Sequence, residues 1–157
     1  MNNTLKTASV LAMIAGILMV IAGAWGIIFT YQNVTREKIT TSADASIPNA
    51  KVAGPFTLKA QADVIRKHTL ESTGGKTYAE MPRQIQQVDS RGNPVFDSEG
   101  QPVMVANSAR DIWITATSLT TALHLGIITY AFSALVLLLG LISIWTSITF
   151  RSIGHSN

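Results

Sequence analysis

Two long stretches without charged residues dominate the pattern of hydrophobic and polar positions along this chain. The first covers residues 8–30 and the second covers residues 125–150. Each is longer than the ~20 residues with which an α-helix crosses the ~30 Å hydrocarbon core of a membrane. The pattern predicts a membrane protein of mainly α fold, with transmembrane helices over residues 8–30 and 122–150 and short tails over residues 1–7 and 151–157.

Small side chains recur every seven residues along both predicted helices. They are Ser9, Gly16, Gly23 and Thr30 in the first helix, and Gly126, Ser133, Gly140 and Ser147 in the second. Small residues let two helix backbones approach closely, and this spacing suits a shallow crossing angle. We therefore predict an antiparallel two-helix transmembrane hairpin packed along these eight residues, here called the seam. Glycine and serine are also frequent in membrane helices in general, so this alternative stays open.

The polar residues 31–121 form a long loop region between the two helices. Basic residues are shared almost equally between the tails, with Lys6 and Arg151, and the flanks of the loop region, with Arg36, Lys38 and Arg110. Long loops cross the membrane largely regardless of charge. We expect a two-pass protein of the cell membrane, with both tails in the cytoplasm and the loop region outside.

A cleaved signal peptide is the competing interpretation of residues 8–30. Lys6 precedes the apolar run, and Ala22, Gly23 and Ala24 resemble a small-residue cleavage site. The run continues past these residues and is long for a signal peptide. We therefore favour a retained membrane anchor.

Within the loop region the pattern predicts one short helix and several turns. In residues 57–72, Leu58, Ala62 and Ile65 share one face, as in an amphipathic helix, and the glycines at 74–75 end it. The polar, turn-rich residues 35–55 before it are expected to form an extended connection. Ser108 and Asp111 are expected to cap the start of the second long helix.

A direct repeat follows the short helix. Residues 89–96 and 97–104 both read Asp-Ser-x-Gly, then a polar residue, Pro and two apolar residues. Such turn chemistry predicts β-turns or hairpins with short strands, which the prolines confine to edges. Calcium binding by Asp89, Asp97 and Glu99 is the alternative, although their spacing is not that of an EF-hand.

The apolar face of Leu58, Ala62 and Ile65 is narrow, and a loop region of this size buries little core alone. We expect the face to dock either on the apolar segments at 95–96 and 103–104 or on a partner protein. We favour the partner, so the isolated loop region should be largely disordered.

The rest of the composition argues against several kinds of catalytic, metal and binding site. The chain has no cysteine, which excludes disulfides, thiolate nucleophiles and cysteine-ligated metals, and its net charge of +3 is too small and dispersed to indicate nucleic-acid binding. His68 and Glu71 lie one helical turn apart, but a non-haem iron site needs a second histidine. The apolar stretches hold no ionisable residue of the kind that marks an ion pathway. We predict no catalytic residue, metal or cofactor.

Residues 53–57 (AGPFT), 60–68 (AQADVIRKH) and 73–80 (TGGKTYAE) resemble a family of small actinobacterial membrane proteins. The resemblance covers nearly the whole chain. Members share one helix, a polar loop that opens with a stretch like residues 37–40 (EKIT), and a second helix. The repeat at 89–104 looks like an insertion relative to shorter members. Members often carry the label "aromatic-ring-opening dioxygenase", which looks like a transferred name because this sequence lacks the ligand set.

The resemblance also implies a partner, since proteins of this kind are expected as accessory subunits of the actinobacterial cytochrome bcc–aa3 respiratory supercomplex. We therefore expect a non-catalytic accessory subunit of a larger membrane complex, in contact with lipid and with larger integral membrane subunits. A stand-alone cell-envelope protein that binds a wall component or a secreted partner is the alternative. A non-haem iron ring-cleaving dioxygenase is a remote alternative.

Overall fold

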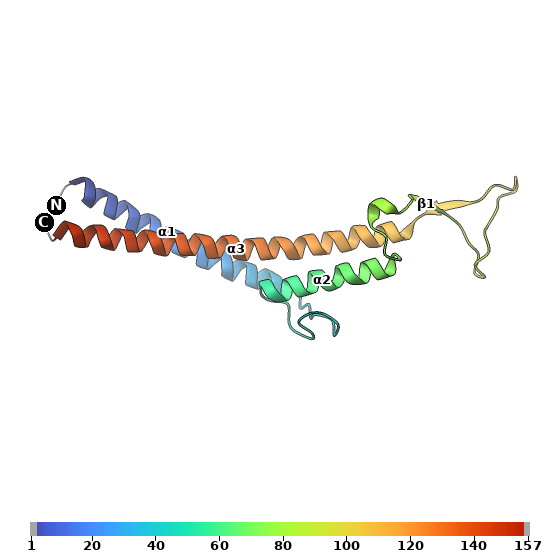
Figure 1. The fold of residues 1–157 in the computed structure, drawn as a ribbon, viewed down its shortest axis with the longest axis horizontal. Coiled ribbons are helices and arrows are strands. Elements are labelled where there is room, and N and C mark those ends of the chain that lie inside the picture. Colours follow the sequence, from blue (N-terminus) through green and yellow to red (C-terminus); the bar gives the residue numbers. More distant parts are fainter. Residues whose placement is uncertain (1–2, 156–157) are drawn as a thin grey trace.

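Two long helices form the body of the protein, as the sequence predicts. The structure, a computed structural model, describes residues 3–155. Helix α1 covers Asn3–Arg36 and helix α3 covers Ser108–His155, and the two pack antiparallel with both chain ends at one end of the molecule (Figure 1). Both helices are long and apolar enough to cross a membrane.

Helix α3 extends well beyond its apolar stretch. Its first turns carry Arg110, Asp111 and Trp113, and they project past the end of α1 (Figure 1). Asn107, and not Ser108, caps the helix, because its Oδ1 accepts a hydrogen bond from the Ala109 N–H at 3.2 Å. Asp111 lies in the first turn, where the negative charge of a carboxylate interacts favourably with the helix dipole. We call residues 108–124 the arm of α3.

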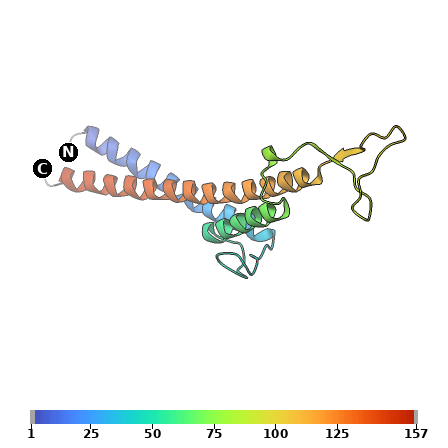
Figure 2. The ribbon, with the colours of Figure 1, turned by 45° about the vertical axis from the view of Figure 1, so that its right-hand side comes forward.

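Helix α2 covers Pro55–Ser72 and lies along the arm of α3 (Figures 1 and 2). Pro55 opens it, and the Thr57 hydroxyl accepts hydrogen bonds from the N–H groups of Ala53 and Gly54. Gly74 and Gly75 end the helix with φ angles of +62° and +78°, a backbone conformation that favours glycine. The predicted start and stop signals therefore lie close to the observed ends.

The apolar face of α2 is covered by the chain itself. Leu58 and Ala62 are buried with Val52 and Leu123, and partly buried side chains from the three helices and the α1–α2 loop complete this core: Val34, Ile39, Ile65, Ile127 and Tyr130. The prediction that Leu58 and Ala62 face a partner is wrong, because α3 supplies apolar residues on its arm and in its apolar stretch. Neither does α2 dock on the repeat, which lies beyond the far end of the arm (Figure 1).

The connection between α1 and α2 is a closed loop and not an extended segment. Thr40 and Lys51 form an antiparallel bridge at its neck. The Thr41 side chain is buried there, and its Oγ1 accepts a hydrogen bond from Ala50 N at 2.9 Å and donates one to Ile47 O. A polar sequence folds compactly here because one hydroxyl satisfies two backbone groups.

The repeat forms two successive tight turns at the tip of a protruding hairpin (Figures 1 and 2). Its base is the antiparallel pair of β1 (Gln84–Gln86) and β2 (Met104–Ala106), with Ile85 opposite Val105. Bridges between Val88 and Pro94 and between Phe96 and Pro102 close the two turns. The short helix η1 (Tyr78–Glu80) precedes the hairpin and rests on the arm.

Candidate functional site

The seam residues lie where α1 and α3 meet. At the end near the termini, Ser9 and Ser147 are almost fully buried and are joined by three contacts. The two hydroxyl oxygens lie 3.0 Å apart, Ser147 Oγ donates to Ser9 O at 2.6 Å, and Ser9 Oγ lies 3.0 Å from Ser147 O. These bonds satisfy the hydrogen-bonding groups of two serine side chains, and lipid tails offer no such partners.

In the middle of the seam, the two backbones touch at glycines. A Cβ atom added to Gly16 would lie 2.8 Å from the carbonyl oxygen of Gly140, and one added to Gly140 would lie 2.8 Å from that of Gly16. One added to Gly23 would lie 2.7 Å from Ser133 O. Because these neighbours are backbone atoms, a side chain at any of the three glycines would push the helices apart.

Gly26 belongs to the same contact, although it does not share the seven-residue spacing. A Cβ atom there would overlap the Ser133 hydroxyl. Thr30, the last seam residue of α1, donates its hydroxyl to Gly26 O and is buried. The sequence contained a signal for Gly26 only in its three-residue distance from Gly23, one helical turn away.

At Gly126 the close backbone contact between α1 and α3 gives way to looser contacts between side chains. The nearest atoms to a Cβ on Gly126 belong to the Leu58 side chain of α2, at 3.2 Å, and not to the α1 backbone. Here α2 enters the angle between the two long helices, and Tyr130 fixes its start by donating its hydroxyl to Ala53 O at 2.6 Å. Six of the eight seam residues therefore lie at the α1–α3 contact, Thr30 is buried beside Gly26, and Gly126 lies where three helices meet.

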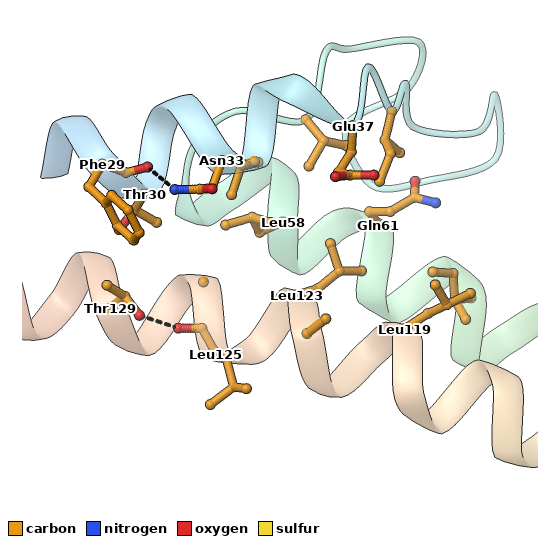
Figure 3. A pocket seen from close by; sticks show the side chains of 16 residues that line it. Phe29, Thr30, Asn33, Glu37, Leu58, Gln61, Leu119, Leu123, Leu125 and Thr129 are labelled. Atoms are coloured by element: carbon orange, nitrogen blue, oxygen red, sulfur yellow. Dashed lines mark hydrogen bonds between the residues drawn. The ribbon is translucent and has the colours of Figure 1, made fainter. Parts of the chain in front are cut away.

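A groove of about 660 Å³ opens at this junction (Figure 3). We call it the interfacial groove. Apolar side chains dominate its walls, with Phe29 and Leu125 toward one end and Glu37 and Gln61 toward the other (Figure 3). The full lining comprises Phe29, Thr30, Asn33, Val34, Glu37, Ile39, Val52, Leu58, Gln61, Ile65, Leu119, Ala122, Leu123, Leu125, Gly126 and Thr129.

One residue that lines this groove, Gln61, has an unsatisfied polar atom. Gln61 Oε1 is buried and has no hydrogen-bond partner among residues 3–155. Gln61 precedes Ala62 on α2 and is one of the residues that line the groove. Sequence reasoning missed Gln61, since a glutamine beside an apolar stripe is usually solvated.

A second, shallower groove of about 490 Å³ runs between α2 and the arm of α3. We call it the arm groove. Ile65 and Thr69 of α2 and Ile112, Thr115 and Leu119 of α3 line it, with His68, Ser72, Asp111 and Ala116. Of the predicted docking face, Ile65 borders the arm groove, and both Ile65 and Leu58 border the interfacial groove.

His68 pairs with the α1–α2 loop and not with Glu71. Its Nε2 lies 2.9 Å from Asp44 Oδ2, which also accepts a hydrogen bond from Lys67 Nζ at 2.8 Å. These two partners lower the pKa of Asp44 from 3.8 to about 2, with the Lys67 hydrogen bond as the larger cause. Within residues 3–155, no three histidine, aspartate or glutamate side chains come together as a metal site would require.

The acidic residues of the repeat close its turns. Asp89 Oδ1 accepts hydrogen bonds from the N–H groups of Arg91 and Asn93, and Asp97 Oδ1 accepts them from Glu99 and Gln101. The Asn93 and Arg91 N–H groups lower the pKa of Asp89. This is Asx-turn chemistry, which accounts for the aspartates without a calcium ion.

Comparison of the chain with protein-family models, curated proteins and solved structures found no match. Its function must therefore be argued from its own residues.

Proposed function

We propose that this protein is a non-catalytic accessory subunit of a larger membrane complex. In this proposal α1 and α3 cross the cell membrane as a two-pass hairpin, the tails lie in the cytoplasm, and α2, the arm and the hairpin lie outside. The resemblance described above makes the cytochrome bcc–aa3 respiratory supercomplex the specific candidate.

The observation that carries the proposal is the shape of α3. The helix is 48 residues long, which at 1.5 Å per residue is about 70 Å. A hydrocarbon core of ~30 Å accommodates less than half of it. The remainder includes an arm that α2 braces from the side and that projects rigidly from the bilayer. Such an arm suits a protein that contacts its neighbours both inside and outside the membrane.

The arm also bears apolar side chains that lipid does not cover in this arrangement. Ile112 is 44% exposed and Leu119 is 50% exposed, and both line the arm groove beside Ile65. An apolar groove with a polar edge is typical of a surface that binds another protein. We assign the contact with a partner subunit outside the membrane to the arm groove.

Affinity purification tests both parts of the proposal. A tagged chain extracted in mild detergent is expected to carry subunits of the bcc and aa3 complexes, identified by mass spectrometry. The Ile112→Asp variant should reduce their recovery about tenfold, because it places a charge in an apolar contact. Ile114→Asp is the matched control: Ile114 is 52% exposed on the same helix but does not line the arm groove.

The alternatives give different results in the same experiment. Recovery of a wall component or a secreted protein without respiratory subunits would indicate a stand-alone envelope protein. A chain that purifies alone would contradict the accessory role. Equal losses with Ile112→Asp and Ile114→Asp would move the contact away from the arm groove.

A further inference from the structure

The start of α2 lies at the level where the uncharged stretches of α1 and α3 end. Tyr130 lies about 8 Å along α3 from the end of its stretch at Leu125, and its hydroxyl donates to Ala53 O at 2.6 Å. Thr30 ends the stretch of α1, and it lines the interfacial groove together with Leu58 from the first turns of α2 (Figure 3). With the helices crossing a bilayer as proposed above, this level is where acyl chains give way to head groups.

The segment held at this level is uncharged and has one apolar side chain that the protein does not cover. The residues between Lys51 and Lys59 carry no charge. Val52 and Leu58 among them are buried in the core, whereas Phe56 is 80% exposed. Both lysines are exposed, and ammonium groups on either side of an apolar side chain suit the phosphates of a lipid surface.

Aromatic side chains of α1 gather at the same level. Trp25 and Phe29 stack with their ring centroids 5.1 Å apart, and both are exposed, as is Tyr31. Aromatic side chains are enriched where a membrane meets water. A single exposed apolar residue is ordinary on a surface that faces water, but the depth of Phe56 places it beside this aromatic set.

We propose that Phe56 inserts into the membrane leaflet on this side and that the start of α2 is an interfacial anchor. The ring lies among the upper parts of the acyl chains, and Lys51 and Lys59 lie at the lipid phosphates. Lipid is favoured over a partner subunit because the bond from Tyr130 to Ala53 fixes the depth of this segment within the chain itself. The anchor attaches α2 to the bilayer in addition to the two long helices.

Spin labels on the full-length protein in lipid nanodiscs test this depth, because the chain has no cysteine of its own. Three exposed phenylalanines give matched variants: Phe56→Cys at the anchor, Phe132→Cys within the uncharged stretch of α3, and Phe96→Cys on the hairpin. We expect dissolved oxygen to relax the label at Phe56→Cys more strongly than a water-soluble nickel chelate does, as at Phe132→Cys. The label at Phe96→Cys should show the reverse.

The three labels separate this proposal from the membrane crossing on which it rests. A label at Phe132→Cys that the nickel chelate reaches would show that α3 does not cross the bilayer. A label in lipid at Phe132→Cys with one in water at Phe56→Cys would refute the anchor alone. Since the nanodisc holds no other protein, that result would leave Phe56 as a contact for water or for a partner subunit.

Hydrogen exchange of residues 52–60 in the same nanodiscs supplies a second test. Phe56→Asp places a charge where the ring meets lipid and should lower the protection severalfold, whereas Phe56→Leu should preserve it. In water the aspartate variant should have the opposite effect, because an acidic residue in the first turn of a helix interacts favourably with its dipole. Equal or higher protection in Phe56→Asp would therefore contradict insertion.

Discussion

At the scale of single residues, the contact between α1 and α3 depends on the absence of a side chain at the glycines. Gly16 and Gly140 face each other with a backbone oxygen where a side chain would start, so neither position has room to relax. Gly126 differs, since its neighbour is the flexible end of Leu58. Glycines that look equivalent by spacing are therefore unequal in packing.

This difference gives a direct prediction. Gly140→Ala should destabilise the helix pair by about 1–3 kcal/mol, the usual cost of overpacking, because its Cβ would lie 2.8 Å from Gly16 O and Val20 N. Gly126→Ala should cost less, since a Cβ at 3.2 Å from Leu58 Cδ1 needs only a small side-chain shift. Both changes improve helix propensity equally, so the comparison isolates packing.

Unfolding by SDS in mixed micelles, followed by circular dichroism, measures the two variants against the original protein. Equal stabilities for Gly140→Ala and Gly126→Ala would show that the backbones do not approach as closely as described.

Sequence periodicity shows which residues are small, but not what each one meets. Heptad spacing selected Gly16, Gly23 and Gly140, which all touch the opposite backbone. It missed Gly26, which lies out of register, and Gln61, whose burial depends on how α2 enters the helix junction. The roles of both residues depend on how the helices pack in three dimensions, which the spacing of residues along one helix does not encode.

At the scale of elements, α2 is held from two sides. The core around Leu58 joins it to α1 and α3, and Asp44 joins its polar face to the α1–α2 loop through Lys67 and His68. The periodicity of α2 identified its apolar face, yet not the surface that covers it. The α1–α2 loop was expected to be extended because its residues are polar, and it is closed because Thr41 bonds across its neck.

The Asp44 contact predicts how the loop responds to acid. A carboxyl group whose pKa is lowered from 3.8 to about 2 in the folded state stabilises that state above about pH 4. The stabilisation is lost as the pH falls through about 2, when the folded protein also takes up the proton. Hydrogen-exchange protection of residues 42–50 should therefore be constant down to about pH 4 and decrease between pH 4 and pH 2.

Asp44→Asn should lower the same protection severalfold at neutral pH, since it removes the charge that Lys67 pairs with. Asp63→Asn is a suitable control, because Asp63 pairs with Lys59 inside α2 and does not touch the loop. Unchanged protection in Asp44→Asn would mean that the backbone bonds at Thr41 hold the loop without this ion pair.

At the scale of the whole molecule, the structure is an apolar helix pair with an arm, a bracing helix and a hairpin at one end (Figure 1). The antiparallel pair and the turn-rich tip could be predicted from the two uncharged stretches and the Asp-Ser-x-Gly repeat. The length of the arm could not, because residues 108–124 mix polar and apolar positions and contain no signal for where the bilayer ends.

The proposed orientation can be tested because the chain contains no cysteine of its own. A cysteine introduced by Ser98→Cys at the exposed tip of the hairpin should react with a membrane-impermeant maleimide on intact cells. A cysteine introduced by Ser152→Cys near the C-terminal end of α3 should react only after the cells are lysed. Both serines are exposed, so accessibility within the protein is matched. The reverse labelling pattern would place the loop region in the cytoplasm.

If α3 crosses the membrane as proposed, its unbroken course links the thickness of the bilayer to the position of the hairpin. Residues Ser108–His155 include no proline, and α2 stiffens the part of the helix nearest the tip. A span that exceeds the local hydrocarbon thickness tilts to hide its apolar surface. Any such tilt rotates the arm through the same angle. Because the arm is about 25 Å long, the hairpin at its end is displaced sideways and in height. A thin membrane and a thick one would thus present the two Asx turns at different heights and distances above neighbouring proteins.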